Sequence, residues 1–144
     1  MNVAVIGAGP IGCYVAFLLA KKGHKVDVYE NHGVIGSPIQ CTGLLTSDFD
    51  QFNLPMDSFL VNTFNKVEVY SKNEKLEIKQ KEYLVCRKKF DNFFGDLAKG
   101  AGVNFHLNHS FLRKEGKNLI IKDSKKVVEK KVSPDLVIAS DGPL

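Results

Sequence analysis

The chain has 144 residues, and its 20 basic side chains outnumber its 16 acidic ones for a net charge of +4. Hydrophobic residues make up 44% and charged residues 25%, which excludes a disordered chain, and neither an apolar run long enough to cross a membrane nor an aromatic and basic stripe of the nucleic-acid-binding kind is present. The three widely separated cysteines exclude a disulfide framework or zinc knuckle, so we expect one soluble domain, without metal, from a reducing compartment.

The first thirty residues predict a strand, a glycine-rich turn, a helix and a second strand. Residues 2–6 are apolar and largely β-branched, as in a buried parallel strand, and no charged segment of a secretory signal precedes them. We expect Gly23 to end the helix and residues 25–29 to form the second strand, closed by Glu30. The apolar face of the helix is predicted from helical spacing to consist of Ile11, Val15, Leu18 and Leu19.

The glycines between the first strand and the helix form a dinucleotide-binding fingerprint. Gly7 permits the tight turn, Gly9 lets the backbone approach a pyrophosphate, and Gly12 allows close packing of helix on strand. Glu30 follows at about the expected spacing of 20 residues, where its carboxylate accepts hydrogen bonds from ribose hydroxyls. A glycine-rich turn of another α/β protein is the alternative, and the motif alone does not separate FAD from NAD.

Residues 33–43 contain glycines and a proline without helical or strand periodicity, which predicts an ordered loop. This loop follows the ribose-binding strand, so we expect it at the carboxyl edge of the sheet, over the cofactor. Cys41 is interpreted as a small buried hydrophobic residue, because nothing nearby in the sequence indicates a thiol of lowered pKa.

The later segments predict a strand-rich region, a second helix and three further stretches of strand. Phe90, Phe93, Phe94 and Leu97 recur at helical spacing, and we expect Gly100 and Gly102 to end that helix. We expect a short helix from Thr46, half-buried strands at 67–70 and 76–78, strands at 83–86 and 103–107, a meander with strands at 119–121 and 126–128, and a buried parallel strand at 135–139.

Two segments resemble the geranylgeranyl reductase family of FAD-dependent oxidoreductases, within the para-hydroxybenzoate-hydroxylase-like flavoproteins. They are Glu30-Asn31-His32 with Ile35-Gly36-Ser37-Pro38-Ile39-Gln40-Cys41, and Arg87-x-x-Phe90-Asp91. Asp141-Gly142-Pro143 resembles a second flavoprotein motif. A proline after the second glycine, here Pro10, is also typical of flavoproteins. The family's Cys-Gly-Glu-Gly is replaced here by Cys41-Thr42-Gly43-Leu44.

The resemblance implies FAD as cofactor and reduction of carbon–carbon double bonds in prenyl chains, including those of archaeal membrane lipids. It implies a prenyl lipid substrate, a reduced electron donor (NAD(P)H or ferredoxin), and a cytoplasmic protein with transient contact with the membrane surface. No catalytic residue is assigned. The expected cofactor-binding residues are Gly7, Gly9, Pro10, Ile11, Gly12, Glu30, Asn31, Cys41, Thr42, Leu44, Arg87, Phe111, Asp141 and Gly142.

We therefore expect a three-layer, Rossmann-like α/β FAD-binding domain, with a parallel sheet and an antiparallel β-meander. It would span residues 1–144, with an inserted strand region at about 60–86 and no substrate domain, as the front portion of a larger flavoprotein. The alternatives are a related FAD-dependent monooxygenase, hydroxylase or halogenase, and a truncated nucleotide-binding module without catalytic activity.

Overall fold

The computed structural model describes residues 1–142. They form two compact units, one made of Met1–Ser37 with the chain from Asp91 onward, and the other of Pro38–Phe90. The expected strand region at 60–86 lies inside the second unit. Of the Asp141-Gly142-Pro143 motif, Pro143 falls outside the described residues.

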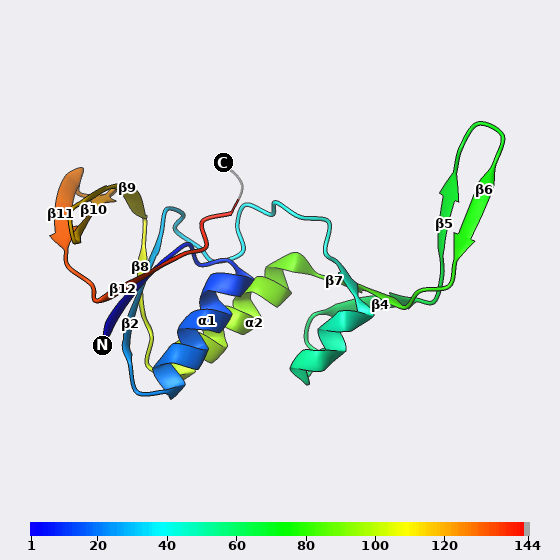
Figure 1. Cartoon of the computed structure of the whole chain (residues 1–144), viewed down its shortest axis with the longest axis horizontal. Coiled ribbons are helices and arrows are strands. Elements are labelled where there is room, and N and C mark those ends of the chain that lie inside the picture. Colours follow the sequence, from blue (N-terminus) through cyan, green and yellow to red (C-terminus); the bar gives the residue numbers. More distant parts are fainter. Residues whose placement is uncertain (143–144) are drawn as a thin grey trace. The chain divides into compact units, whose positions relative to one another are not determined.

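The first unit is built on a parallel sheet in the order β12-β1-β2-β8. Figure 1 labels three of its strands, β2, β8 and β12. Its strands are β1 (Asn2–Ile6), β2 (Lys25–Glu30), β8 (Asn104–Leu107) and β12 (Leu136–Ala139). β1 pairs with β2 on one side and with β12 on the other. The strand order therefore reverses at β1, with β2 and β8 on one side and β12 on the other. The carboxyl end of β1 lies at this switch point, where such sheets bind ligands.

The first helix, the part of the second helix from Asp91 onward, and an antiparallel meander complete the three layers of this unit. Helix α1 (Pro10–Lys21) contacts β1 and β2, and Tyr14 packs edge-on against Phe94 of helix α2 (Arg87–Gly100), with ring centroids 5.6 Å apart. The meander has the order β11-β10-β9, with β9 (His109–Glu115), β10 (Asn118–Asp123) and β11 (Val128–Val132). It packs on the sheet through a buried cluster of Ala4, Ile6, Tyr29, Leu119 and Ile121. The predicted three-layer, Rossmann-like architecture is confirmed.

The predicted apolar face of α1 is only partly the face that it buries, since Val15 and Leu19 are half-buried but the other two predicted residues are exposed. The buried residues are Gly12, Cys13 and Ala16, whereas Ile11 is 69% and Leu18 42% exposed. Small residues occupy the buried face because the helix lies close to the sheet, so bulk rather than hydropathy decides the contact. The prediction for Gly23 is close to the observed end: Lys22 is the C-cap, and Gly23 follows with φ +82°. The amides of Gly23 and His24 return to Ala20 and Leu19, which closes the helix end.

The second unit contains a three-stranded antiparallel sheet in the order β3-β7-β4 and a separate hairpin, β5-β6. The sheet consists of β3 (Leu44–Thr46), β4 (Leu60–Phe64) and β7 (Glu82–Val85), and a 3₁₀ helix, η1 (Ser47–Phe52), follows β3. Phe59 is 1% exposed and packs edge-on against Phe90, with ring centroids 5.1 Å apart. Phe49 lies 5.7 Å from Phe90, so aromatic side chains form the core of this small unit.

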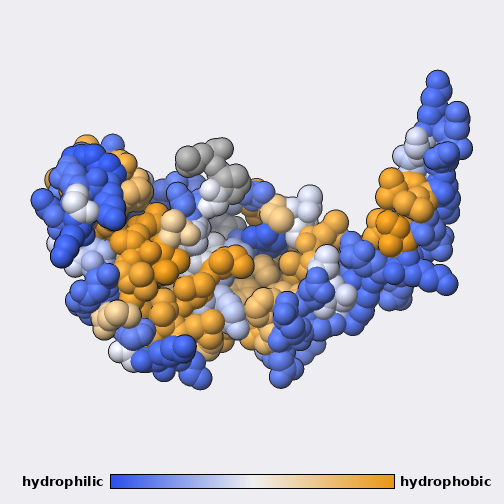
Figure 2. All heavy atoms as spheres, viewed as in Figure 1, coloured by the Kyte–Doolittle hydropathy of each residue, from blue (hydrophilic) through white to orange (hydrophobic). Residues whose placement is uncertain are grey.

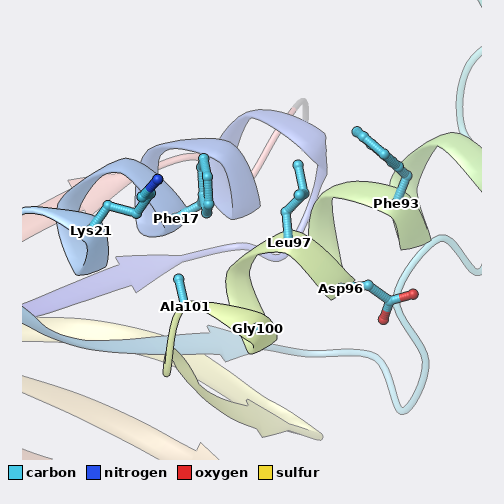
Figure 3. Close-up of a pocket in the computed structure, with 7 residues that line it drawn as sticks. All are labelled: Phe17, Lys21, Phe93, Asp96, Leu97, Gly100 and Ala101. Carbon is cyan, nitrogen blue, oxygen red and sulfur yellow. The ribbon is translucent and has the colours of Figure 1, made fainter. Parts of the chain in front are cut away.

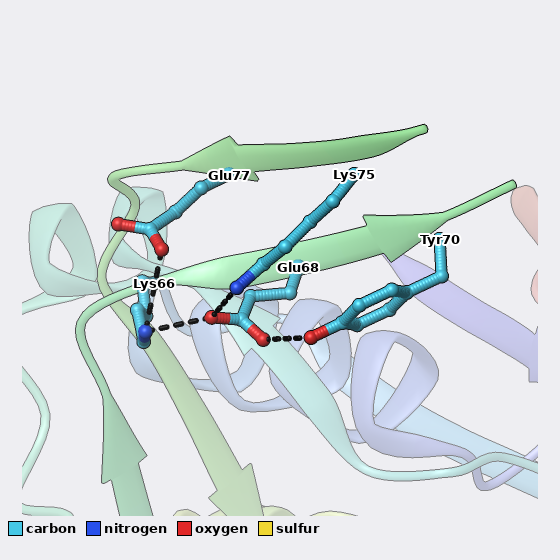
Figure 4. Close-up of polar contacts among 5 residues, drawn as sticks. All are labelled: Lys66, Glu68, Tyr70, Lys75 and Glu77. Carbon is cyan, nitrogen blue, oxygen red and sulfur yellow. Dashed lines mark hydrogen bonds and ion pairs between the residues drawn. The ribbon is translucent and has the colours of Figure 1, made fainter. Parts of the chain in front are cut away.

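The hairpin, β5 (Val67–Tyr70) and β6 (Lys75–Ile78), has one charged and one apolar face. On the charged face, Glu68 binds Lys66, Tyr70 and Lys75 at 2.7, 2.6 and 2.9 Å (Figure 4). These hydrogen bonds lower the pKa of Glu68, and the one from Lys66 has the largest effect. On the other face Leu76 is 58% exposed, and Figure 2 shows this apolar surface on the hairpin. The prediction of two half-buried strands is wrong for β6, since every residue of this strand is exposed.

Two other expectations differ from the structure, and two strands were not expected. β12 was expected to be buried, but it is the edge strand of the sheet, and Leu136 and Val137 are 38% and 36% exposed. The strand expected at 126–128 begins only at Val128, after Val127 with φ +55°. β3 and β9 were not predicted, because three-residue strands and strands with a charged, exposed face carry little alternation. Among the described residues, no helix is long and apolar enough to cross a membrane.

Candidate dinucleotide site

The glycine loop between β1 and α1 is folded tightly against the turn that follows β12. Gly7 has φ +97°, and a Cβ added there would lie 2.8 Å from the carbonyl carbon of Ser140. A Cβ on Gly12 would meet the carbonyl oxygen of Gly7 and would lie 2.5 Å from Oγ of Ser140. Both glycines are therefore required by the fold itself, as the predicted roles of a tight turn and close packing demand.

Gly9 differs from these two glycines. Its φ of −67° suits any residue, and a Cβ added there would meet nothing within 4 Å. No contact within the described chain therefore explains the missing side chain. The space beside Gly9 is open at the start of α1, where a group approaching the loop would need it.

The first turn of α1 offers unpaired amides at this opening. The helix begins at Pro10, which has no N–H. The N-cap residue is Gly9, which has no side chain that could cap the amides of the first turn. The amides of Ile11 and Gly12 lie in the first turn, where no helical carbonyl four residues earlier is available to accept their hydrogen bonds. They therefore have no partner within the helix. Outward amides and the positive end of the helix dipole favour an anion, and a phosphate is the anion that such loops bind.

Glu30 lies at the end of β2 with its carboxylate beside the glycine loop. Its Oε2 accepts a hydrogen bond from the amide of Ala8 at 2.8 Å, and its Oε1 accepts one from the amide of His32 at 2.9 Å. The ring Nδ1 of His32 lies 2.7 Å from Oε1. The side chain of Glu30 is 12% exposed. These bonds fix the carboxylate in position, and Oε2, which has the Ala8 amide as its one partner among the described residues, retains capacity to accept a further hydrogen bond from a hydroxyl group.

The turn after β12 places Ser140, which the sequence did not single out, against the glycine loop. The amide of Ser140 donates to the carbonyl of Ile6 at 2.9 Å, and its hydroxyl lies 2.8 Å from the same oxygen and 3.2 Å from that of Gly7. Asp141 and Gly142 follow directly, Gly142 with φ +76°. The structure thus brings this predicted motif to the glycine loop. The position of Ser140 before Asp-Gly was the available signal.

Four of the expected cofactor residues lie in the second unit. Gly43 has φ +82°, and a Cβ there would lie 3.2 Å from Cγ of Arg87 and would also meet the carbonyl oxygen of Val85. The segment from Cys41 through Thr42 to Leu44 is thereby held against the end of β7 and the start of α2. The structure groups Cys41, Thr42, Leu44 and Arg87 locally, at one place in this unit.

The interpretation of Cys41 as a buried hydrophobic residue is wrong. The residue is exposed, and its pKa is lowered, chiefly by a hydrogen bond from the backbone amide of Gly43 and also by the positive charge of Arg87. Cys13 is the buried cysteine: its thiol donates to the carbonyl of Ala8, and burial raises its pKa to about 12. The sequence could not predict the lowered pKa of Cys41, because the turn at Gly43 is what brings the amide and the guanidinium to the thiol.

Two expected residues have positions with less local support. Asn31 is exposed between Glu30 and His32, at the carboxyl end of β2. Phe111 lies in β9 opposite Ile121, next to an irregularity in the pairing, and is 39% exposed. Neither residue shows a polar contact that indicates a ligand.

The first unit also has a hollow of about 540 Å³ near the far ends of α1 and α2 (Figure 3). Its lining consists of Phe17, Lys21, Phe93, Asp96, Leu97, Gly100 and Ala101. Phe17 and Lys21 lie in the last turns of α1, whereas the glycine loop precedes the first turn. The hollow is therefore separate from the dinucleotide site.

Known proteins similar to this chain support the expected family. The NAD(P)-binding Rossmann-like domain family matches residues 5–73. The digeranylgeranylglycerophospholipid reductase of Picrophilus torridus is 31% identical over 98% of the chain, and that of Thermoplasma acidophilum is 30% identical over 98%. The chain spans 39% of the length of each of these relatives.

Solved structures agree with the sequence comparison. A geranylgeranyl bacteriochlorophyll reductase-like protein from Thermoplasma acidophilum superposes with a TM-score of 0.86 and 27% identity, over 98% of this chain and 39% of that one. A myxobacterial chondrochloren halogenase, described as FAD-dependent, superposes with a TM-score of 0.74 at 18% identity over 98% of this chain and 37% of its own, which shows the shared fold alone. The resemblance to geranylgeranyl reductases is confirmed.

Proposed function

We propose that this chain, similar over almost its whole length to geranylgeranyl reductases, is the FAD-binding portion of an oxidoreductase that reduces double bonds of prenyl chains in archaeal-type lipids. The observation that carries the proposal is the open space at Gly9, next to the first turn of α1, whose Ile11 and Gly12 amides have no partner within the helix, and next to Ala8, whose amide binds the Glu30 carboxylate. The 31% identity to a digeranylgeranylglycerophospholipid reductase supports the choice of substrate class.

The residues of the loop fit a dinucleotide. The amides of Ile11 and Gly12 would bind the pyrophosphate, for which the missing Cβ of Gly9 leaves room. Glu30 would accept hydrogen bonds from the adenosine ribose, and its negative charge would repel a 2′-phosphate. Asn31 and Phe111 are proposed to lie along the adenosine, and Asp141 and Gly142 near the pyrophosphate.

The second unit supplies a further set of proposed contacts. Arg87 is one of two arginines in the chain, and its planar guanidinium suits a phosphate oxygen. The segment of Cys41, Thr42 and Leu44 is proposed to face the flavin. When bound, FAD supplies the two-electron redox chemistry, and the protein binds and orients it. We further propose that NAD(P)H or ferredoxin supplies the electrons and that the protein makes transient contact with the membrane surface.

An FAD-dependent hydroxylase or halogenase shares the first glycine motif and the Asp-Gly turn. The Ser37-Pro38-Ile39-Gln40-Cys41 segment and Arg87-x-x-Phe90-Asp91 favour the reductase. The identities to a reductase-like structure and to the halogenase, 27% and 18%, point the same way. A nucleotide-binding module without catalytic activity is the remaining alternative, and it would bind the dinucleotide without supporting turnover.

A chimera tests the proposed reaction. This chain replaces the matching 39% of the Picrophilus torridus reductase, and the chimera is incubated with FAD, dithionite and a digeranylgeranylglycerophospholipid. We expect mass spectrometry to show two hydrogens added for each reduced double bond. A matched chimera carrying Gly9→Ala should lose this product. A folded chimera that holds FAD but leaves the lipid unreduced would refute the proposed activity, and would favour the non-catalytic alternative.

A further inference from the structure

We propose that the Ser140 hydroxyl is a positioning group for the pyrophosphate of the dinucleotide, because it holds the glycine loop in the conformation that turns its amides outward. The inference rests on the proposed dinucleotide site and adds a residue outside the glycine motif. Ser140 would act through the loop and would not touch the ligand.

The hydroxyl lies where three elements meet. Its oxygen is 2.8 Å from the carbonyl oxygen of Ile6, the last residue of β1, and 3.2 Å from that of Gly7 in the loop. The same oxygen lies 2.5 Å from the place of a Cβ on Gly12, in the first turn of α1. One hydroxyl proton is thus shared between two carbonyls while the oxygen packs against the helix.

The backbone of Ser140 is held independently of its side chain. Its amide donates to the carbonyl of Ile6 at 2.9 Å, and β12 pairs with β1 from Val3 to Ile6. Replacing the side chain by a methyl group therefore leaves the strand in place and removes only the hydroxyl. This separation makes Ser140→Ala an informative change.

The carbonyls of the loop are all directed back to the protein. Those of Ile6 and Gly7 lie within hydrogen-bond distance of the Ser140 hydroxyl, that of Ala8 accepts the Cys13 thiol at 3.3 Å, and that of Gly9 accepts the Cys13 amide at 2.9 Å. A carbonyl that turned toward the opening would present negative charge to a phosphate. Ser140 keeps the Gly7 carbonyl inward, so positive partial charge predominates at the opening.

The test compares ADP, which carries a pyrophosphate, with adenosine, which carries none. We expect Ser140→Ala to bind ADP about tenfold more weakly, equivalent to about 1.4 kcal/mol, with adenosine affinity within about twofold of the wild type. Ser140→Thr keeps the hydroxyl and should restore most of the ADP affinity. Ser133→Ala is the matched control, because the Ser133 hydroxyl binds Asn118 in the meander, away from the loop.

A second readout needs no ligand. Amide hydrogen exchange at Ala8 and Gly9 should become faster in Ser140→Ala and stay unchanged in Ser133→Ala. Unchanged ADP affinity in Ser140→Ala, or an equal loss for ADP and adenosine, would overturn the positioning role while leaving the dinucleotide site intact. A wild-type chain that binds neither ADP nor FAD would overturn the dinucleotide site itself, and this inference with it.

Discussion

Gly9→Ala and Gly12→Ala add the same methyl group to the loop and to the first turn of α1. We expect the first to weaken ligand binding and the second to lower the stability of the fold. A Cβ on Gly9 would meet no atom within 4 Å, and the residue already has a φ of −67°. A Cβ on Gly12 would press into the carbonyl of Gly7 and lie 2.5 Å from Oγ of Ser140. The first change therefore tests the ligand and the second tests the fold.

The magnitudes follow from these surroundings. Gly9→Ala should lower the free energy of unfolding by less than about 1 kcal/mol, because only the modest preference for glycine over alanine at an N-cap is lost. It should weaken ADP binding at least tenfold, since the methyl group fills the space proposed for the pyrophosphate. Gly12→Ala should lower the free energy of unfolding by about 1–3 kcal/mol or more, because β1, the loop and α1 must separate.

Urea unfolding followed by circular dichroism gives the stabilities, and isothermal titration with ADP gives the affinities. Adenosine serves as the ligand control for Gly9→Ala, and its binding should change little. If Gly9→Ala bound ADP as tightly as the wild type, the open space at Gly9 would not be the phosphate site. If Gly12→Ala were as stable as the wild type, the close contact between loop, helix and Ser140 would be wrong.

Three further changes test other parts of the site and of the second unit. Glu30→Gln should weaken binding of adenosine and ADP alike by about ten- to a hundredfold, because charged hydrogen bonds to the ribose are lost; titration of both ligands checks this, and an effect on ADP alone would contradict it. Iodoacetamide should modify Cys41 before Cys13 at neutral pH, since a lowered pKa raises the thiolate fraction; peptide mass spectrometry should show slower labelling in Arg87→Met, and an unchanged rate would exclude the effect of the guanidinium. Phe59→Ala should lower the free energy of unfolding by about 3–5 kcal/mol, because the ring is 1% exposed; a loss below 1 kcal/mol in urea denaturation would refute its core position.

Part of the fold is predictable because its signals are local. The glycines at 7, 9 and 12 require special backbone geometry, and strand, helix and second strand follow in the spacing of a dinucleotide-binding unit. The structure contains each of these elements, with Glu30 beside the loop. The turn after β12 is also recognisable, since Asp141 and Gly142 follow an apolar strand.

The features that escaped prediction depend on contacts between distant segments. The packed face of α1 consists of Gly12, Cys13 and Ala16, because the close approach to the sheet admits only small side chains. Hydropathy favoured the bulkier Ile11, which is 69% exposed. Likewise, Ser140 is far from Gly7 in the sequence, and only the pairing of β12 with β1 brings its hydroxyl to the loop.

Retention of FAD by this chain is the most direct test of the proposed dinucleotide site. The purified protein is incubated with FAD and desalted, and its visible spectrum is recorded, with Gly9→Ala treated in parallel. We expect a flavin spectrum with one FAD for each wild-type chain, displaced by excess ADP, and little flavin on Gly9→Ala. A folded wild-type chain that emerges without flavin absorbance, or equal retention by both proteins, would contradict it.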